Sequence, residues 1–164
     1  IVNMAIAENR KVLIFSQFTS VLQKLGDELS EKNIGYLYLD GSTKANKRVE
    51  MVKEFNESED LKIFLISLKA GGTGLNLTSS DLVLHFDPWW NPAIEDQATD
   101  RAHRIGQQNI VEVIKLIAKD SVEENIIRLQ EDKRELINKV ISGEEIGSNV
   151  IGKLSRDEII DLFS

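Results

Sequence analysis

The sequence predicts an α/β fold with a mostly parallel central sheet. Along its 164 residues, short apolar runs alternate with amphipathic stretches of helical periodicity. The stretches between successive runs have the length of βαβ crossovers, in which a helix joins two parallel strands and covers the sheet. Hydrophobic residues make up 41% of the chain and charged residues 29%, which is typical of a folded globular domain.

Five apolar runs mark the predicted strands. The first, Lys11-Val12-Leu13-Ile14-Phe15, is rich in β-branched and aromatic side chains, which is typical of a strand buried on both faces. The other runs have similar composition. The predicted strands cover residues 11–15, 36–39, 61–67, 81–86 and 110–118.

Two helices are expected between the first three strands. The helix predicted over residues 18–32 ends at Asn33-Ile34-Gly35, and its apolar face consists of Val21, Leu22, Leu25 and Leu29. The helix predicted over residues 44–57 follows the turn Gly41-Ser42-Thr43, which we expect to supply its N-cap. Its inner face is predicted to consist of Val49, Val52 and Phe55.

The second half of the chain predicts further helices. Pro92 suits the first turn of a helix over about 92–104, after a loop that contains Trp89-Trp90-Asn91. Ser121 can cap a long helix that ends at Ser142-Gly143. Residues 154–163 predict a short last helix. The apolar stripe of the long helix consists of Val122, Ile126, Leu129, Leu136 and Val140.

Composition excludes several classes of site. The chain has no cysteine, so it has no disulfide scaffold, cysteine zinc site or thiol nucleophile. It has two histidines, which makes a histidine-rich metal site improbable, and we predict no metal site. No run of 18 apolar residues predicts a membrane span. The net charge of −7 argues against a wholesale nucleic-acid binder but allows a local basic strip.

Residues 69–77 form a glycine-rich loop after the third predicted strand. Three glycines, Gly71, Gly72 and Gly74, would let backbone N–H groups approach a phosphate or a nucleic-acid strand. The alternative is a tight turn with a helix cap. The position at the carboxyl end of a parallel strand favours a ligand-binding loop.

Three polar residues recur at helical spacing after the second proline. Gln97, Arg101 and Arg104 are expected to share one face of the helix predicted over 92–104. Two arginines presented in this way can hold a triphosphate bidentately. The alternative is a solvated face in which Asp100 and Arg104 pair.

Four segments, in this order, resemble motifs of Swi/Snf-type ATPases. Residues 12–18 resemble motif IV, and residues 39–43 resemble the segment after it. Residues 70–77 resemble motif V, and residues 90–107, which end in the highly specific string RAHRIGQ, resemble motif VI with its lead-in. The resemblance covers residues 11 to about 120. It implies the second RecA-like lobe, a three-layer α/β sandwich, of a two-lobed superfamily-two motor.

The resemblance also implies roles in ATP hydrolysis. Arg101 and Arg104 match the arginine fingers, which reach the γ-phosphate of ATP held by the first lobe and neutralise charge that grows in the transition state. Gln97 would order the same interface. The loop that couples nucleotide to DNA would include Gly72, Gly74 and Asn76.

For DNA, the resemblance implies contacts with the backbone of the duplex. Trp90 matches the aromatic residue that meets DNA between the lobes, whereas we expect Trp89 to be buried packing. A DNA-bound protein is a further implied partner, because family members usually remodel protein–DNA complexes. Weaker candidates for phosphate contacts are Ser16, Gln17, Lys44, Lys69 and Asn91.

Two motor motifs are missing from the chain. It has no Walker A loop and no Asp-Glu-x-His sequence for magnesium and the attacking water. We therefore expect ATP and Mg²⁺ to be held mainly by an N-terminal RecA-like lobe of the same polypeptide, and this fragment alone to be inactive. The expected division is a lead-in (1–10), the RecA-like lobe (11–120) and a C-terminal helical extension (121–164).

Two alternatives remain open: a lobe of an RNA helicase, and a catalytically inert binding or regulatory lobe. Residues 41–104 contain eight Lys/Arg and ten Asp/Glu, so a DNA-binding surface must be a narrow strip that binds weakly and in a salt-sensitive way. The missing cysteines and signal peptide suggest a cytoplasmic, nucleoid-associated protein. Residues 89–97 and the long last helix look more like bacterial or archaeal members than eukaryotic ones.

Overall fold

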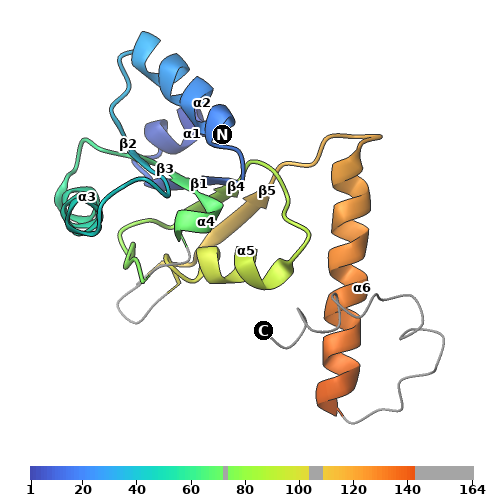
Figure 1. The fold of residues 1–164 in the computed structure, drawn as a ribbon. Helices are drawn as coiled ribbons and strands as arrows, with labels where there is room; N and C mark the ends of the chain where they lie inside the picture. The colour runs from blue at the N-terminus through green and yellow to red at the C-terminus, as the bar shows by residue number, and fades with distance from the viewer. Residues whose placement is uncertain (72–73, 104–108, 143–164) are drawn as a thin grey trace.

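The computed structural model describes residues 1–71, 74–103 and 109–142. Predictions for Gly72, Arg104 and the helix at 154–163 lie outside these residues. Figure 1 shows the order of the elements along the chain. They are α1 (Val2–Ala7), β1 (Val12–Ser16), α2 (Thr19–Glu31), β2 (Tyr36–Leu39), α3 (Ala45–Glu57), β3 (Ile63–Ser67), α4 (Leu68–Gly71), β4 (Leu82–His85), α5 (Pro92–Thr99), β5 (Glu112–Lys115) and α6 (Val122–Ser142).

The five strands form one parallel sheet in the order β2-β3-β1-β4-β5. β1 lies at the centre, where Val12 is in register with Ile63 of β3 and with Leu82 of β4. The predicted α/β fold with a parallel sheet is confirmed. Because all strands run in the same direction, the loops that follow them meet at one edge of the sheet.

Helices cover both faces of the sheet, as Figure 1 shows, and give three layers. Side chains of β1 alternate between the layers: Leu13 and Phe15 pack toward α3, α4 and α5, whereas Val12 and Ile14 pack toward α1 and α2. Each layer has its own apolar cluster. The sheet is therefore buried on both sides, which explains the uninterrupted apolar strands.

The inner face of α3 differs from the prediction. Val49 is 70% exposed, and the buried residues are Met51 and Phe55. Two residues along a helix correspond to a rotation of about 200°, so Val49 points away when Met51 faces the sheet. The cap also differs: Lys44 is the N-cap residue, and its ammonium cannot accept a hydrogen bond from the helix N–H groups. The Thr43 hydroxyl instead accepts the N–H of Asp40 at 3.1 Å.

Other boundaries were also imperfectly predicted. The helices α1 and α4 were not predicted, and β5 is shorter than residues 110–118. α5 ends at Thr99 rather than at 104. The chain then turns back, and the Arg101 carbonyl accepts the N–H of Leu77 at 2.9 Å.

The long helix α6 begins where the sequence predicts. The Ser121 hydroxyl accepts the N–H of Glu123 at 3.2 Å, as expected of an N-cap. The helix stands beside the lobe (Figure 1). Val122 and Leu129 of its predicted apolar stripe are largely exposed, whereas Gln130 and Lys133 are buried. Among the described residues, no helix is both long and apolar enough to cross a membrane.

Candidate functional site

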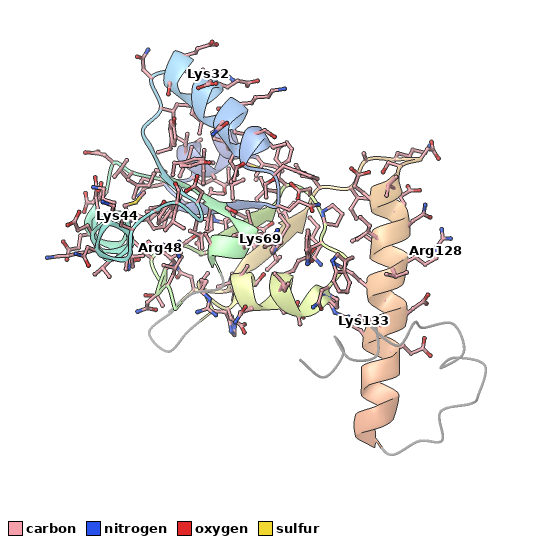
Figure 2. The ribbon with its side chains drawn as sticks, in the orientation of Figure 1. Lys32, Lys44, Arg48, Lys69, Arg128 and Lys133 are labelled. Atoms are coloured by element: carbon pink, nitrogen blue, oxygen red, sulfur yellow. The ribbon has the colours of Figure 1, made fainter. Side chains whose placement is uncertain are left out.

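The predicted DNA-contact residues lie along the carboxyl edge of the sheet, in the segments that follow four of its strands. Ser16 and Gln17 end or follow β1, Lys69 lies in α4 directly after β3, and Trp90 lies in the loop after β4. Lys44 precedes α3, in the segment that follows β2. Figure 2 shows Lys44 at α3 and Lys69 at α4, and both side chains are exposed.

Ser16 and Gln17 contact the loop after β4. The buried hydroxyl of Ser16 donates to the carboxylate of Asp87, and the backbone N–H of Gln17 donates to Asp87 Oδ1 at 2.9 Å. The Gln17 side chain donates to the Pro88 carbonyl at 3.4 Å. The Ser16 hydroxyl is thus engaged inside the lobe, where it braces the tryptophan loop, residues 88–91.

The tryptophan loop has one ring toward the core and one toward α6. Trp89 packs against the apolar cluster under α3–α5, as predicted, and the ring centroids of Trp89 and Trp90 lie 6.3 Å apart. The Lys133 ammonium lies 4.7 Å from the centroid of the Trp90 ring. The Asn91 side chain accepts the N–H of Ala93 at 3.2 Å and caps α5. Its side-chain oxygen thus has a structural partner.

A buried ion pair lies behind this loop. Glu95 is 1% exposed, forms an ion pair with Lys115 of β5 and accepts the backbone N–H of Trp89 at 2.5 Å. Lys115 also donates to the Gln130 side chain at 3.3 Å. A buried ion pair loses its hydration and is stable only when further hydrogen bonds satisfy its polar atoms. The contacts with the Trp89 N–H and the Gln130 side chain supply such bonds.

His85, at the end of β4, is a buried neutral histidine. Its Nε2 atom lies 3.0 Å from the Thr99 hydroxyl, and its ring stacks on Phe15. Burial lowers the pKa of His85 to about 4, with opposing contributions from nearby charges. The ring is therefore uncharged at neutral pH and ties β4 to the end of α5.

Arg101 lies beyond the end of α5, in the turn that returns to the glycine-rich loop. Its Nε donates to the carbonyl of Gln97 at 2.9 Å, and the residue is 6% exposed. The predicted helical face is therefore wrong in detail, because Arg101 is no longer helical. The Arg101 guanidinium and Gln97 nonetheless lie together, and the Gln97 side chain is exposed.

The described part of the glycine-rich loop contains the short helix α4 and an open position at Gly74. α4 accounts for residues 68–71, and Gly74 has φ +56° with nothing within 4 Å of the position of a Cβ. A glycine is favoured there by its left-handed backbone. Leu75 and Leu77 anchor the segment in the core. Asn76 is exposed, and its carbonyl accepts the Asn56 side chain at 2.8 Å.

Comparison with known proteins decides the family. The helicase conserved C-terminal domain family matches residues 1–106. This chain belongs to that family. Its resemblance to Swi/Snf-type ATPases is also confirmed. An Arabidopsis thaliana protein, named as a SWI/SNF-related, matrix-associated, actin-dependent regulator of chromatin, is 45% identical over 133 residues, which is 80% of this chain and 15% of that protein.

Two further matches cover nearly the whole of this chain. An uncharacterized ATP-dependent helicase of Mycoplasma pneumoniae is 41% identical over 163 residues, covering 99% of this chain and 16% of that protein. The crystal structure of the C-terminal part of the Fun30 ATPase domain matches with a TM-score of 0.75 at 38% identity, covering 96% of this chain and 48% of that one. This match confirms the RecA-like fold. The chain spans about a sixth of the length of the Mycoplasma pneumoniae and Arabidopsis thaliana proteins.

Arg48 is a residue of the helicase lobe that the sequence analysis missed. It donates to the carbonyls of Thr43 at 2.8 Å, Asp40 at 3.2 Å and Ala70 at 3.5 Å. It therefore ties the turn after β2 to α4, at the start of the glycine-rich loop. Its position in the sequence could have indicated this contact: Arg48 lies three residues before the buried Met51 and therefore on the inner side of α3.

The described residues of the helicase lobe do not provide a magnesium site. Nowhere among them do three His, Asp or Glu side chains gather to hold a metal ion. A cavity of about 500 Å³ lies near the amino-terminal ends of the strands, between residues such as Glu8 and Lys62, and contains none of the predicted site residues. The described residues of the lobe therefore do not form a set of ligands that would hold Mg²⁺ on their own.

Proposed function

We propose that this chain is the second motor lobe of an ATP-dependent double-stranded DNA translocase that remodels protein–DNA complexes. The observation that carries the proposal is the gathering, at one edge of a parallel sheet, of the glycine-rich loop, the exposed lysines Lys44 and Lys69, and the tryptophan loop. The confirmed family supports it, as does the relative named as a regulator of chromatin.

The ATP-dependent step would need a second lobe. We propose that an N-terminal RecA-like lobe of the same polypeptide holds ATP, with its Mg²⁺, and that this chain approaches from the other side. Arg104 would neutralise charge on the γ-phosphate in the transition state. Arg101 would act beside it as the second finger, held by its bond to the Gln97 carbonyl. Gly72, Gly74 and Asn76 would connect the nucleotide to DNA.

On the DNA side, we propose contacts with phosphates and the groove rather than with base edges. Lys44 and Lys69 are exposed cations that can approach phosphates, and Trp90 offers an aromatic surface. Gln17 would contribute its amide, which has a second N–H besides the one that it donates to the Pro88 carbonyl. Ser16 and Asn91, whose side chains already have partners, would act by shaping the loops that carry these contacts. Binding to DNA would also place the protein in the nucleoid.

This function can be tested by measuring which nucleic acid stimulates ATP hydrolysis. The two-lobed parent protein is assayed for ATP hydrolysis with no nucleic acid, with duplex DNA and with RNA at equal nucleotide concentration. The proposal expects strong stimulation by duplex DNA and little by RNA. Stimulation by RNA alone would identify an RNA helicase lobe instead, and hydrolysis that ignores both polymers would favour an inert binding lobe.

A further inference from the structure

The tryptophan loop is held by a helix that lies outside the motor motifs. The Gln130 side chain of α6 donates to the carbonyl of Trp89, and its side-chain oxygen accepts from Lys115 of β5 at 3.3 Å. Gln130 is 2% exposed although α6 stands beside the lobe. One α6 side chain thus connects the loop after β4 with the last strand of the sheet.

Both backbone polar groups of Trp89 are engaged by this arrangement. Glu95 accepts its N–H, Gln130 donates to its carbonyl, and Lys115 joins the two side chains. Buried polar groups in such a network are costly to leave unpaired, so displacing α6 would leave Gln130 and the Trp89 carbonyl without their partners. The position of the loop therefore depends on the position of α6.

One turn further along α6, a cation lies over the second tryptophan. Lys133 is 8% exposed, and its ammonium lies 4.7 Å from the centroid of the Trp90 ring. In the described part of the chain, no carboxylate lies within 4.0 Å of this ammonium. The aromatic face of Trp90 is thus a favourable partner for this ammonium.

A further polar contact of α6 with the lobe is weaker. Arg134 pairs with Asp96 at 2.8 Å, but both side chains are about half exposed, and such pairs contribute little. Figure 2 shows Lys133 on the side of α6 that faces the lobe and Arg128 on the opposite side. Buried contacts with the tryptophan loop therefore distinguish Gln130 and Lys133 from the exposed Arg128 and the half-exposed Arg134.

We propose that α6 is a latch for the tryptophan loop, in which Gln130 and Lys133 are positioning residues that set the place of Trp90 for contact with DNA. The inference rests on the proposed function, because the DNA contact of Trp90 is part of it. The latch itself does not depend on DNA. A movement of α6 would therefore change the position of Trp90 and, with it, the contact with DNA.

Fluorescence can test the latch directly, since Trp89 and Trp90 are the two tryptophans of the chain. The 164-residue chain is prepared as wild type, Lys133→Met, Gln130→Leu and the control Arg128→Met, and circular dichroism is used to compare their folds. We expect the acrylamide quenching constant to rise about twofold in Gln130→Leu and Lys133→Met, because the freed loop opens to solvent. Arg128→Met, which removes the same charge from the outer face of α6, should match wild type.

The second readout is ATP hydrolysis by the two-lobed parent protein as a function of duplex DNA concentration. In Gln130→Leu and Lys133→Met, the concentration for half-maximal stimulation should rise about fivefold to tenfold, with a smaller change in the maximal rate. Arg128→Met should leave both unchanged. If Gln130→Leu does not fold, Lys133→Met alone decides the result.

The outcomes separate the latch from the function on which it rests. Unchanged quenching in the folded latch variants would overturn the latch. The latch would also be overturned if Trp90→Ala weakened the stimulation of ATP hydrolysis by DNA and the latch variants did not. The proposed function would then still stand. If the stimulation of ATP hydrolysis by DNA were the same in Trp90→Ala as in wild type, the proposed DNA contact of Trp90 would be contradicted, whatever the fluorescence shows.

Discussion

The carboxylate of Asp87 accepts the hydroxyl hydrogen of Ser16, so the segment that leaves β4 is tied to the end of β1. The backbone N–H of Gln17 donates to the same carboxylate. We expect Asp87→Ala to lower the free energy of unfolding by about 1–3 kcal/mol, because the buried Ser16 hydroxyl and the Gln17 N–H lose their acceptor. Urea denaturation measures the change. Asp60→Ala, at an exposed carboxylate, should change it little; equal losses in both variants would contradict this role of Asp87.

Stability should fall at mildly acidic pH because of His85. Burial lowers its pKa from 6.5 to about 4, so the folded state favours the neutral ring. A lowered histidine pKa stabilises the fold above the unfolded pKa, and this contribution is lost as pH falls from about 6.5 toward 4. Between pH 7 and pH 5 we expect it to cost about 2 kcal/mol.

The matched variant for this prediction is His85→Gln, which cannot titrate but can still reach Thr99. Urea denaturation at several pH values should show a shallower loss of stability in His85→Gln than in wild type. Identical pH profiles would mean that carboxylates, not His85, account for the acid sensitivity.

Two glycines offer a matched pair of substitutions near the proposed site. At Gly74 the positive φ, rather than a lack of space, should make Gly74→Ala cost about 1 kcal/mol. Gly41 also has open space around the Cβ position but no positive φ, so Gly41→Ala should be nearly neutral. Thermal unfolding compares the two. A Gly74→Ala variant as stable as Gly41→Ala would show that the left-handed backbone is not required.

The lysines at the carboxyl edge should determine the salt dependence of DNA binding. The isolated lobe is expected to bind duplex DNA weakly, and each of Lys44→Gln and Lys69→Gln should reduce the slope of log K against log salt concentration by about 0.9. Lys32→Gln is the control, because Lys32 lies at the far end of α2 (Figure 2). Fluorescence anisotropy gives the slopes. A larger effect from Lys32 than from either edge lysine would place the DNA elsewhere.

Much of the fold was predictable because it depends on local patterns. The bounds of β2 agree with the sequence prediction, and the apolar runs located the other strands. The six residues of α1 contain too little periodicity to predict a helix. The prediction for Val49 was wrong because a single apolar residue does not determine which face of a helix packs on the sheet; in α3 that face contains Met51 and Phe55.

The candidate site was predictable only in part. The loops of the quoted motifs lie at one edge of the sheet, because parallel strands place their carboxyl ends together. The network of Glu95, Lys115 and Gln130 was not predicted, since its partners are far apart in sequence and form no local pattern. The end of α5 was missed for a similar reason: Leu77, from the glycine-rich loop, bonds to the carbonyl of Arg101.

We propose above that this lobe supplies an arginine finger, Arg104, to a DNA-dependent motor. The most direct test measures ATP hydrolysis by the two-lobed parent protein, with and without duplex DNA, for wild type and Arg104→Ala, together with ATP binding. We expect DNA-stimulated hydrolysis in wild type and a loss of about 10³-fold or more in Arg104→Ala, with ATP binding retained. Hydrolysis that ignores DNA, or that survives Arg104→Ala, would contradict it.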